Sequence, residues 1–193
     1  MKTIPLLLLV SLASASVGFT QSAPQPAPSA HEWQQSQKTD TGRTFTYTQF
    51  TLVGTFVTPP HDPVANRPTL ALDCIPANGS HRAKGRLLAG NLLVGTTLKI
   101  VYVEPEEIRG TSYFPKVAVR YHTDGGKDME DNWTPGTDKT SVAIPTDVLK
   151  QQLRAHSVAI TADDDRGSPV AMRFDIPDPT LVEQGCHLDE HKK

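Results

Sequence analysis

The sequence predicts a mainly β protein: an antiparallel β-sandwich of about seven or eight strands, with one short α-helix late in the chain. Three observations carry this prediction. Many short segments alternate apolar and polar residues, which is the period of a half-buried strand. Turn residues separate these segments, and helical spacing is clear only once. Because strands and helices do not alternate along the chain, an antiparallel sandwich is expected rather than a doubly wound parallel sheet.

The first half of the folded body contains four strand candidates. Residues 44–57 are rich in β-branched and aromatic side chains, which favour strands, and Gly54 within them indicates a bulge or a break. Pro59 and Pro60 end this segment. Three further candidates follow at residues 69–75, 87–94 and 97–103.

The second half shows the cleanest alternation. Val117, Val119 and Tyr121 face one way in residues 116–123, and residues 169–176 alternate in the same manner. We expect the apolar faces of these strands to share one core. Shorter strands are predicted at residues 139–144 and 157–161.

Helical spacing is clear in one place. Leu149 and Leu153 fall on one face at i, i+4 spacing, so residues 148–155 are predicted to form a helix with Thr146 as its N-cap. A single further turn of helix is expected near residues 180–184.

Composition excludes several classes of protein. The 193 residues include 19 basic and 21 acidic side chains, a net charge of -2. A charge this close to zero argues against a nucleic-acid binder, whose domains are usually strongly basic. With 37% hydrophobic residues the chain can build a core, so wholesale disorder is excluded. Two cysteines are too few for a disulfide-dense scaffold or for a zinc site of four thiolates.

The N-terminus has the three parts of a secretory signal. Lys2 supplies the positive charge, residues 6–10 form the apolar centre, and residues 13–15 offer small side chains to signal peptidase. A transmembrane helix would need about 20 apolar residues, and this run is shorter. The sequence therefore predicts a signal peptide at residues 1–15 and a periplasmic or secreted protein, cleaved near Ala15, without a transmembrane anchor.

The rest of the chain divides into three parts. Residues 16–43 include three prolines in alternation with small and polar residues, and we expect a Pro-rich disordered tether there. Folded structure is predicted to begin between Trp33 and Thr44, with a single domain at residues 44–188. The last residues, 189–193, are predicted to be a free tail.

The two cysteines predict one disulfide. In an exported protein a lone pair of cysteines is usually bridged, and Cys74 and Cys186 are 112 positions apart. Closing so long a loop is worth about 4–5 kcal/mol in the chain-entropy model. The alternative is two unrelated buried thiols.

The order of several features resembles a known kind of protein. A strand with Cys74 precedes residues 117–124 (Val-Ala-Val-Arg-Tyr-His-Thr-Asp), and Trp133, a helix, a strand ending in Phe-Asp-Ile, and Cys186 follow. This order of features resembles that of small exported bacterial β-sandwich proteins, including the periplasmic accessory proteins of type VI secretion loci. The resemblance covers roughly residues 69–188. It implies the fold and the bridge, and it supplies no catalytic residue.

Motifs for catalysis and for metal binding are missing from the sequence. It contains no Gly-x-Ser-x-Gly, no His-Glu-x-x-His and no Gly-rich phosphate loop. Acidic loops near Asp124 and Asp164 lack the calcium-loop pattern and are typical of turns, although calcium remains the alternative. His187 and His191 lie in the terminal tail. We therefore predict no catalytic residue, no metal ligand and no cofactor.

Five residues form the candidate binding set. Arg120, His122, Arg173 and Asp175 alternate with apolar positions, so they should line exposed sheet faces. Trp133 would add an aromatic anchor to such a surface. The sequence nevertheless favours a position in the core for Trp133 over this exposed one.

The leading hypothesis is an exported, non-enzymatic β-sandwich protein that acts through protein–protein contact in a cell-envelope or secretion assembly. Its partner would be another envelope or extracellular protein, and not a nucleic acid. One alternative is a module that binds a small molecule or a glycan, with or without a metal. A hydrolase that uses carboxylates is the third hypothesis. A deep polar pocket would favour the alternatives, whereas a flat or weakly grooved face would favour protein contact.

Overall fold

The structure is a computed structural model that describes residues 31–40, 42, 45–62, 64, 66–76, 86–104 and 113–186. These residues form eleven strands and two short helices. The strands are β1 (Gln34–Asp40), β2 (Phe45–Val53), β3 (Thr55–Thr58), β4 (Thr69–Pro76), β5 (Arg86–Leu93), β6 (Val101–Val103), β7 (Phe114–Thr123), β8 (Met129–Pro135), β9 (Ser141–Ile144), β10 (Ser157–Asp163) and β11 (Pro169–Asp175). The helices are α1 (Thr146–Gln152) and α2 (Thr180–Cys186).

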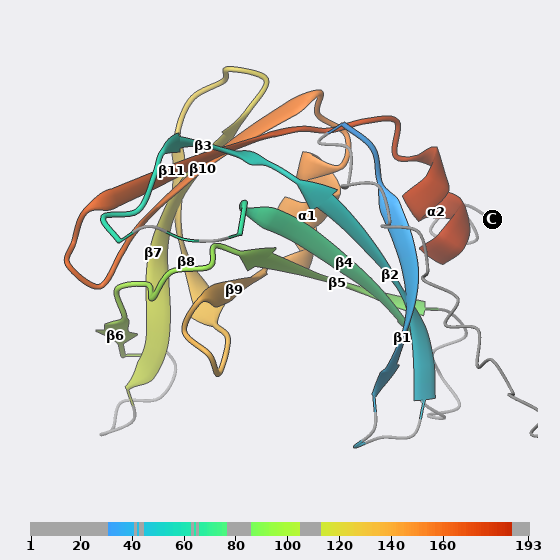
Figure 1. Cartoon of the computed structure of the whole chain (residues 1–193), viewed down its shortest axis with the longest axis horizontal. Helices are drawn as coiled ribbons and strands as arrows, with labels where there is room; N and C mark the ends of the chain where they lie inside the picture. Colours follow the sequence, from blue (N-terminus) through green and yellow to red (C-terminus); the bar gives the residue numbers. More distant parts are fainter. Residues whose placement is uncertain are drawn as a thin grey trace, which may run out of the picture.

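The strands build one curled antiparallel sheet with the shape of a half-barrel (Figure 1). The order of the strands in the sheet is β1-β2-β4-β5-β9-β8-β7-β10-β11-β3. Strand β6 stands outside this order and pairs with β7. The prediction of a mainly β, antiparallel protein is confirmed. The prediction of a sandwich of seven or eight strands is wrong, because a single sheet curls to cover its own inner face.

Gly54 is the corner at which the sheet curls. It joins β2 to β3, yet β2 pairs with β4 and β3 pairs with β11 at the opposite end of the strand order. A Cβ atom at Gly54 would lie 2.6 Å from the ring of Phe174 and 2.7 Å from the carbonyl oxygen of Arg173. Only glycine allows the backbone to approach this closely. The break predicted at Gly54 is therefore the point at which the chain passes from β2, near one end of the sheet, to β3 at the other end.

The inner faces of the strands share one hydrophobic core. On β7 the residues Val117, Val119 and Tyr121 are buried, as their alternation predicts, and β11 buries Val170 and Phe174 in the same way. The predicted strand at residues 97–103 is reduced to the three residues of β6.

Both helices pack on the inner side of the sheet. Leu149 of α1 lies so close to Gly90 on β5 that a Cβ at Gly90 would meet it at 2.8 Å. Gly185 of α2 packs against the ring of Phe50 on β2. The helix expected at residues 148–155 is therefore present as α1, and the expected turn near residues 180–184 extends to a second helix.

The N-cap prediction for α1 is wrong. Pro145, not Thr146, precedes the helix, and no side chain caps it. The Pro145 carbonyl accepts the Leu149 N–H at 2.9 Å, and proline suits this place because it has no N–H of its own to satisfy.

The predicted disulfide between Cys74 and Cys186 is confirmed, with the two Cα atoms 5.2 Å apart. It joins β4 to the end of α2 and so fastens the C-terminal helix to the sheet. None of the described helices is long and apolar enough to cross a membrane.

The domain boundaries can be compared only in part. Strand β1 lies inside the range 16–43 that the sequence assigns to a tether, so the folded body begins before residue 44. Its start at Gln34 falls within the interval between Trp33 and Thr44. The sequence of β1 is polar throughout and shows no alternation of apolar and polar residues. This edge strand is held in place by its backbone pairing with β2. The predicted signal at residues 1–15 and tail at residues 189–193 lie outside the described residues.

Candidate functional site

The candidate site is the outer face of four neighbouring strands, β8, β7, β10 and β11. The register places Arg120 of β7 between Glu130 of β8 and Thr161 of β10. One step along β7, His122 lies opposite Ala159, which in turn lies opposite Arg173 of β11. The predicted residues Arg120, His122, Arg173 and Asp175 thus share one outer face, because they alternate with buried positions on their strands.

Trp133 does not belong to this face. Its side chain is only 1% exposed and packs on the inner side, with its ring 5.6 Å from that of Tyr121. The indole Nε1–H donates to Asp131 Oδ2 at 3.0 Å. The core position that the sequence favours for Trp133 is therefore confirmed, and its candidate role as an exposed aromatic anchor is wrong, because residue 133 faces the inner side of β8.

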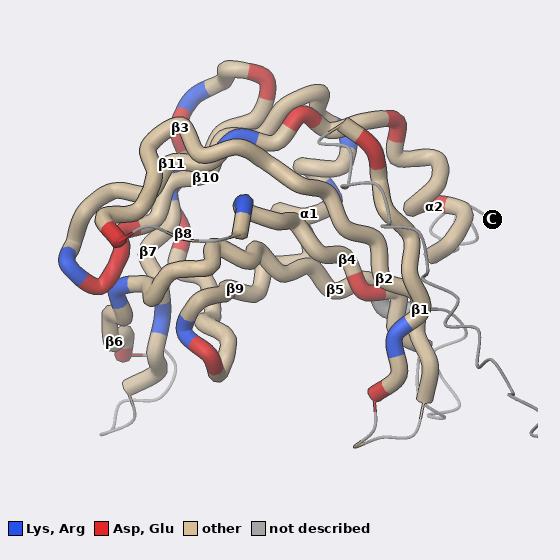
Figure 2. The backbone as a smooth tube through the Cα atoms, viewed as in Figure 1, with Lys and Arg blue, Asp and Glu red and all other residues tan. Residues whose placement is uncertain are grey.

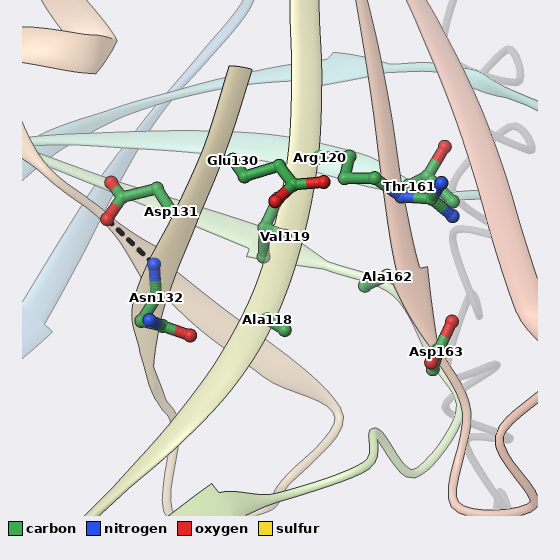
Figure 3. A pocket seen from close by; sticks show the side chains of 9 residues that line it. All are labelled: Ala118, Val119, Arg120, Glu130, Asp131, Asn132, Thr161, Ala162 and Asp163. Carbon is green, nitrogen blue, oxygen red and sulfur yellow. Dashed lines mark hydrogen bonds between the residues drawn. The ribbon is translucent and has the colours of Figure 1, made fainter. Parts of the chain in front are cut away.

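A shallow polar groove of about 330 Å³ crosses the outer face (Figure 3). Its outward-facing lining consists of Ala118, Arg120, Glu130, Asn132, Thr161 and Asp163. The small side chain of Ala118 leaves room between the longer ones. Arg120 extends over Thr161, and within the described part of the chain its guanidinium has no carboxylate within 4.0 Å.

Two local pairs of polar side chains flank this groove. His122 Nδ1 lies 2.7 Å from Asp128 Oδ1, and Arg173 Nε lies 3.2 Å from Asp175 Oδ1. These side chains are exposed by a third or more, so each pair contributes less than about 1 kcal/mol to stability. Figure 2 shows basic and acidic positions together in this half of the molecule.

An apolar groove continues the same outer row toward the start of β7. Phe114 and Lys116 have the parity of Ala118 and Arg120, and they line a groove of about 410 Å³ with Val103, Pro115 and Thr134. Lys116 Nζ donates to Thr134 Oγ1 at 3.1 Å. Phe114, which lines the groove, is 49% exposed to solvent, and the neighbouring residues Tyr102 and Tyr113, which do not line it, are also exposed.

Sequence reasoning missed this apolar groove. Residues 113–115 precede the predicted strand, so Tyr113 and Phe114 were not part of any alternating pattern. The available signal is the Tyr-Phe-Pro run itself, since two adjacent aromatic residues before a proline cannot both face the core of a strand.

The acidic loops serve as turns. Asp124 Oδ1 accepts the backbone N–H groups of His156 and Ser157, each at 2.8 Å. Asp164 is buried, and its carboxylate accepts N–H groups from Ser168 at 2.8 Å, Arg166 at 3.0 Å and His61 at 3.3 Å. Burial opposes the ionisation of Asp164, but these hydrogen bonds outweigh it and hold the pKa below its usual value. No three His, Cys, Asp or Glu side chains among the described residues are placed to hold a metal ion.

Comparison with known proteins gives no match: no family model, no curated protein and no solved structure is similar to this chain. The resemblance to accessory proteins of type VI secretion loci therefore stays a prediction.

Proposed function

We propose that this protein is an exported, non-enzymatic protein that acts through protein–protein contact in a cell-envelope or secretion assembly. One observation carries the proposal: a polar groove around Arg120 and an apolar groove around Phe114 lie in one row on the outer face of β7. Both grooves are open at the surface. An open face suits a partner protein better than an enclosed small molecule.

The chemistry of the row supports protein contact. Interfaces are enriched in aromatic residues and arginine, and their apolar anchors sit beside polar side chains. Phe114 supplies exposed aromatic surface at one end, and Arg120 supplies a cation without a described ion-pair partner at the other.

Export is supported by two features. The Cys74–Cys186 disulfide is of a kind that forms and persists in oxidising compartments. The residues at positions 1–15 have the pattern of a secretory signal. The resemblance to periplasmic accessory proteins points to the same compartment.

A glycan or small-molecule module is the second candidate. The polar groove has a volume at the lower end of the range for ligand sites, roughly 300–1,000 Å³. Asn132, Glu130 and Thr161 could hydrogen-bond the hydroxyl groups of a sugar.

Site-specific photo-crosslinking in the source cells tests the proposal. A photoreactive residue at Ala118 or Thr161 should give a discrete protein adduct, and Arg120→Glu should weaken it. The matched control is Thr51, a partly exposed position on the outer face of β2, which should give no such adduct. Absence of the adduct, or equal crosslinking from Thr51, would contradict protein contact. Sugar binding that Asn132→Ala abolishes would favour the second candidate.

A further inference from the structure

Strand β8 has a neighbouring strand on only one side for most of its length. It pairs with β7 from Met129 to Trp133, but it pairs with β9 only at Thr134 and Pro135. Strand β9 stops at Ile144 because the next residue is a proline, which has no N–H to donate and begins the turn into α1. Within the described part of the chain, residues 129–133 of β8 therefore form an open sheet edge.

The register identifies the backbone groups at this edge. The Gly136 N–H donates to the Ser141 carbonyl at 2.8 Å, so Thr134, Asn132 and Glu130 direct their backbone groups toward the same side. The N–H of Asn132 is bonded to Asp131 Oδ1 at 2.7 Å. No neighbouring strand pairs with the Glu130 N–H, the Glu130 carbonyl or the Asn132 carbonyl on this side. Such a row is a template for another strand.

The residues along the open edge itself are acidic. Asp128, Glu130 and Asp131 lie in or next to β8, whereas the basic residues Lys127 and Lys116 lie near its two ends, Lys116 being bonded to Thr134. Burial raises the pKa of the Tyr121 phenol, and the charges of Asp131 and Asp147 raise it further, so both carboxylates lie near that ring. Arg120, which lies opposite Glu130 on β7, is directed over Thr161 and away from the edge (Figure 3).

We propose that the open edge of β8 binds an extended, basic segment of a partner protein by strand addition. The inference rests on the proposed function and deepens it, because it names the chemistry of the partner. Backbone hydrogen bonds at Glu130 and Asn132 would supply affinity, and alternate side chains would supply specificity. An inward-pointing charge such as Asp131 disfavours an apolar strand, and a lysine or arginine offsets that penalty.

A labelled Lys-Val-Lys-Val-Lys-Val peptide is the probe. It should bind the protein at low salt, bind more weakly as salt rises, and slow hydrogen exchange at the Glu130 amide. A Glu-Val peptide of equal length should not bind.

Two variants test the site. Asn132→Pro removes an N–H that points away from β7, so the ladder between β7 and β8 is kept while the approach of a strand is blocked; Asn132→Thr is its control. Glu130→Lys reverses one exposed charge and tests the same edge if the proline variant does not fold. Each should weaken peptide binding by about tenfold or more.

The outcomes separate this inference from the proposed function. No binding of the basic peptide up to about 1 mM, equal binding of the acidic peptide, or unchanged exchange at Glu130 overturns strand addition. If the adduct from Ala118 persists unchanged in Asn132→Pro, the outer face contacts a partner and strand addition fails. If the peptide protects Glu130 but no adduct forms from Ala118, strand addition holds and the proposed outer-face contact fails.

Discussion

The two halves of the curled sheet bury similar inner faces but carry different outer faces. The first half, β1, β2, β4, β5 and β9, has both helices on its inner side and holds the disulfide. Its outer face is made largely of neutral side chains such as Thr51, Ala71 and Asn91. The second half, β8, β7, β10, β11 and β3, presents Arg120, Glu130 and other charged residues outward.

One carboxylate on the outer face of the first half shows the contrast. Asp73 accepts a hydrogen bond from Gln49 Nε2 at 2.8 Å across the pair β2–β4. Partial burial raises the pKa of Asp73 despite that bond and a nearby lysine, Lys38. Glu130 of the second half is exposed, and none of the described ion pairs includes it, so its charge is available to a partner.

The largest effect is expected from the disulfide, which belongs to the first half alone. Cys74→Ser should lower the free energy of unfolding by about 2–5 kcal/mol, because the unfolded chain regains the freedom of a 112-residue loop. Thermal unfolding should show a fall in Tm of roughly 5–15 °C.

The control for the disulfide is the double variant Cys74→Ser/Cys186→Ser, which should match the single one. Hydrogen exchange should rise in α2 before it rises in β7. An unchanged Tm, or equal loosening of both halves, would contradict the division between them.

The joint between the halves should be the next most sensitive place. Gly54→Ala would force a methyl group against the ring of Phe174, and we expect a loss of about 1–3 kcal/mol. Gly42→Ala is the control, because a Cβ there meets its nearest atom at 3.4 Å. Chemical denaturation measures both variants. Equal stability of the two would show that the corner tolerates a side chain.

A pH-dependent contribution is expected from Asp164, which ties the loop after β3 to the turn between β10 and β11. Asp164→Asn should cost about 1–2 kcal/mol at neutral pH. Since the pKa of the folded carboxyl is lowered, its contribution is complete above the unfolded pKa and is lost as the pH falls below about 4.

Urea unfolding at several pH values measures this effect. The difference between Asp164→Asn and the unaltered protein should shrink as the pH drops from about 5 to 3. A difference that is constant over this range would mean that the charge of Asp164 does not stabilise the turn.

The smallest effect is expected on the outer face of the second half. Arg120→Ala should change the free energy of unfolding by less than about 0.5 kcal/mol, because this exposed side chain has no ion pair within the described residues. Val119→Ala on the same strand, which is buried, should cost more than 1 kcal/mol by roughly the usual scale. A large loss from Arg120→Ala in urea unfolding would give Arg120 a structural role and weaken its candidacy as a contact residue.

Much of the second half could be predicted from its sequence. Strands β7 and β11 alternate strictly, so the parity of Arg120, His122, Arg173 and Asp175 follows from their neighbours. Strand β8 has weak alternation, with Glu130 and Asn132 beside the charged Asp131. Alternation therefore does not decide on which side Trp133 lies; the core position was favoured by the nature of its side chain, and the structure confirms it.

The pairing partners of the strands could not be predicted from local patterns in the sequence. Strand β1 has no apolar residue in Gln34–Asp40, so nothing in its own sequence indicates a strand, and it exists because β2 offers a free edge. The open edge of β8 is likewise decided by where β9 stops, which depends on a proline ten positions after the end of β8. Neither feature leaves a periodic signal.

The sequence by itself determined which residues turn inward on each regular strand, the region of α1 and the pairing of the only two cysteines. These follow from side-chain hydrophobicity, helical spacing and residue count, which act locally or need no geometry. Only the tertiary structure decided that one sheet curls at Gly54 and that β8 keeps an open edge. Those outcomes depend on contacts between residues far apart in the chain, and an alternating pattern specifies a buried face without specifying which strand lies beside it.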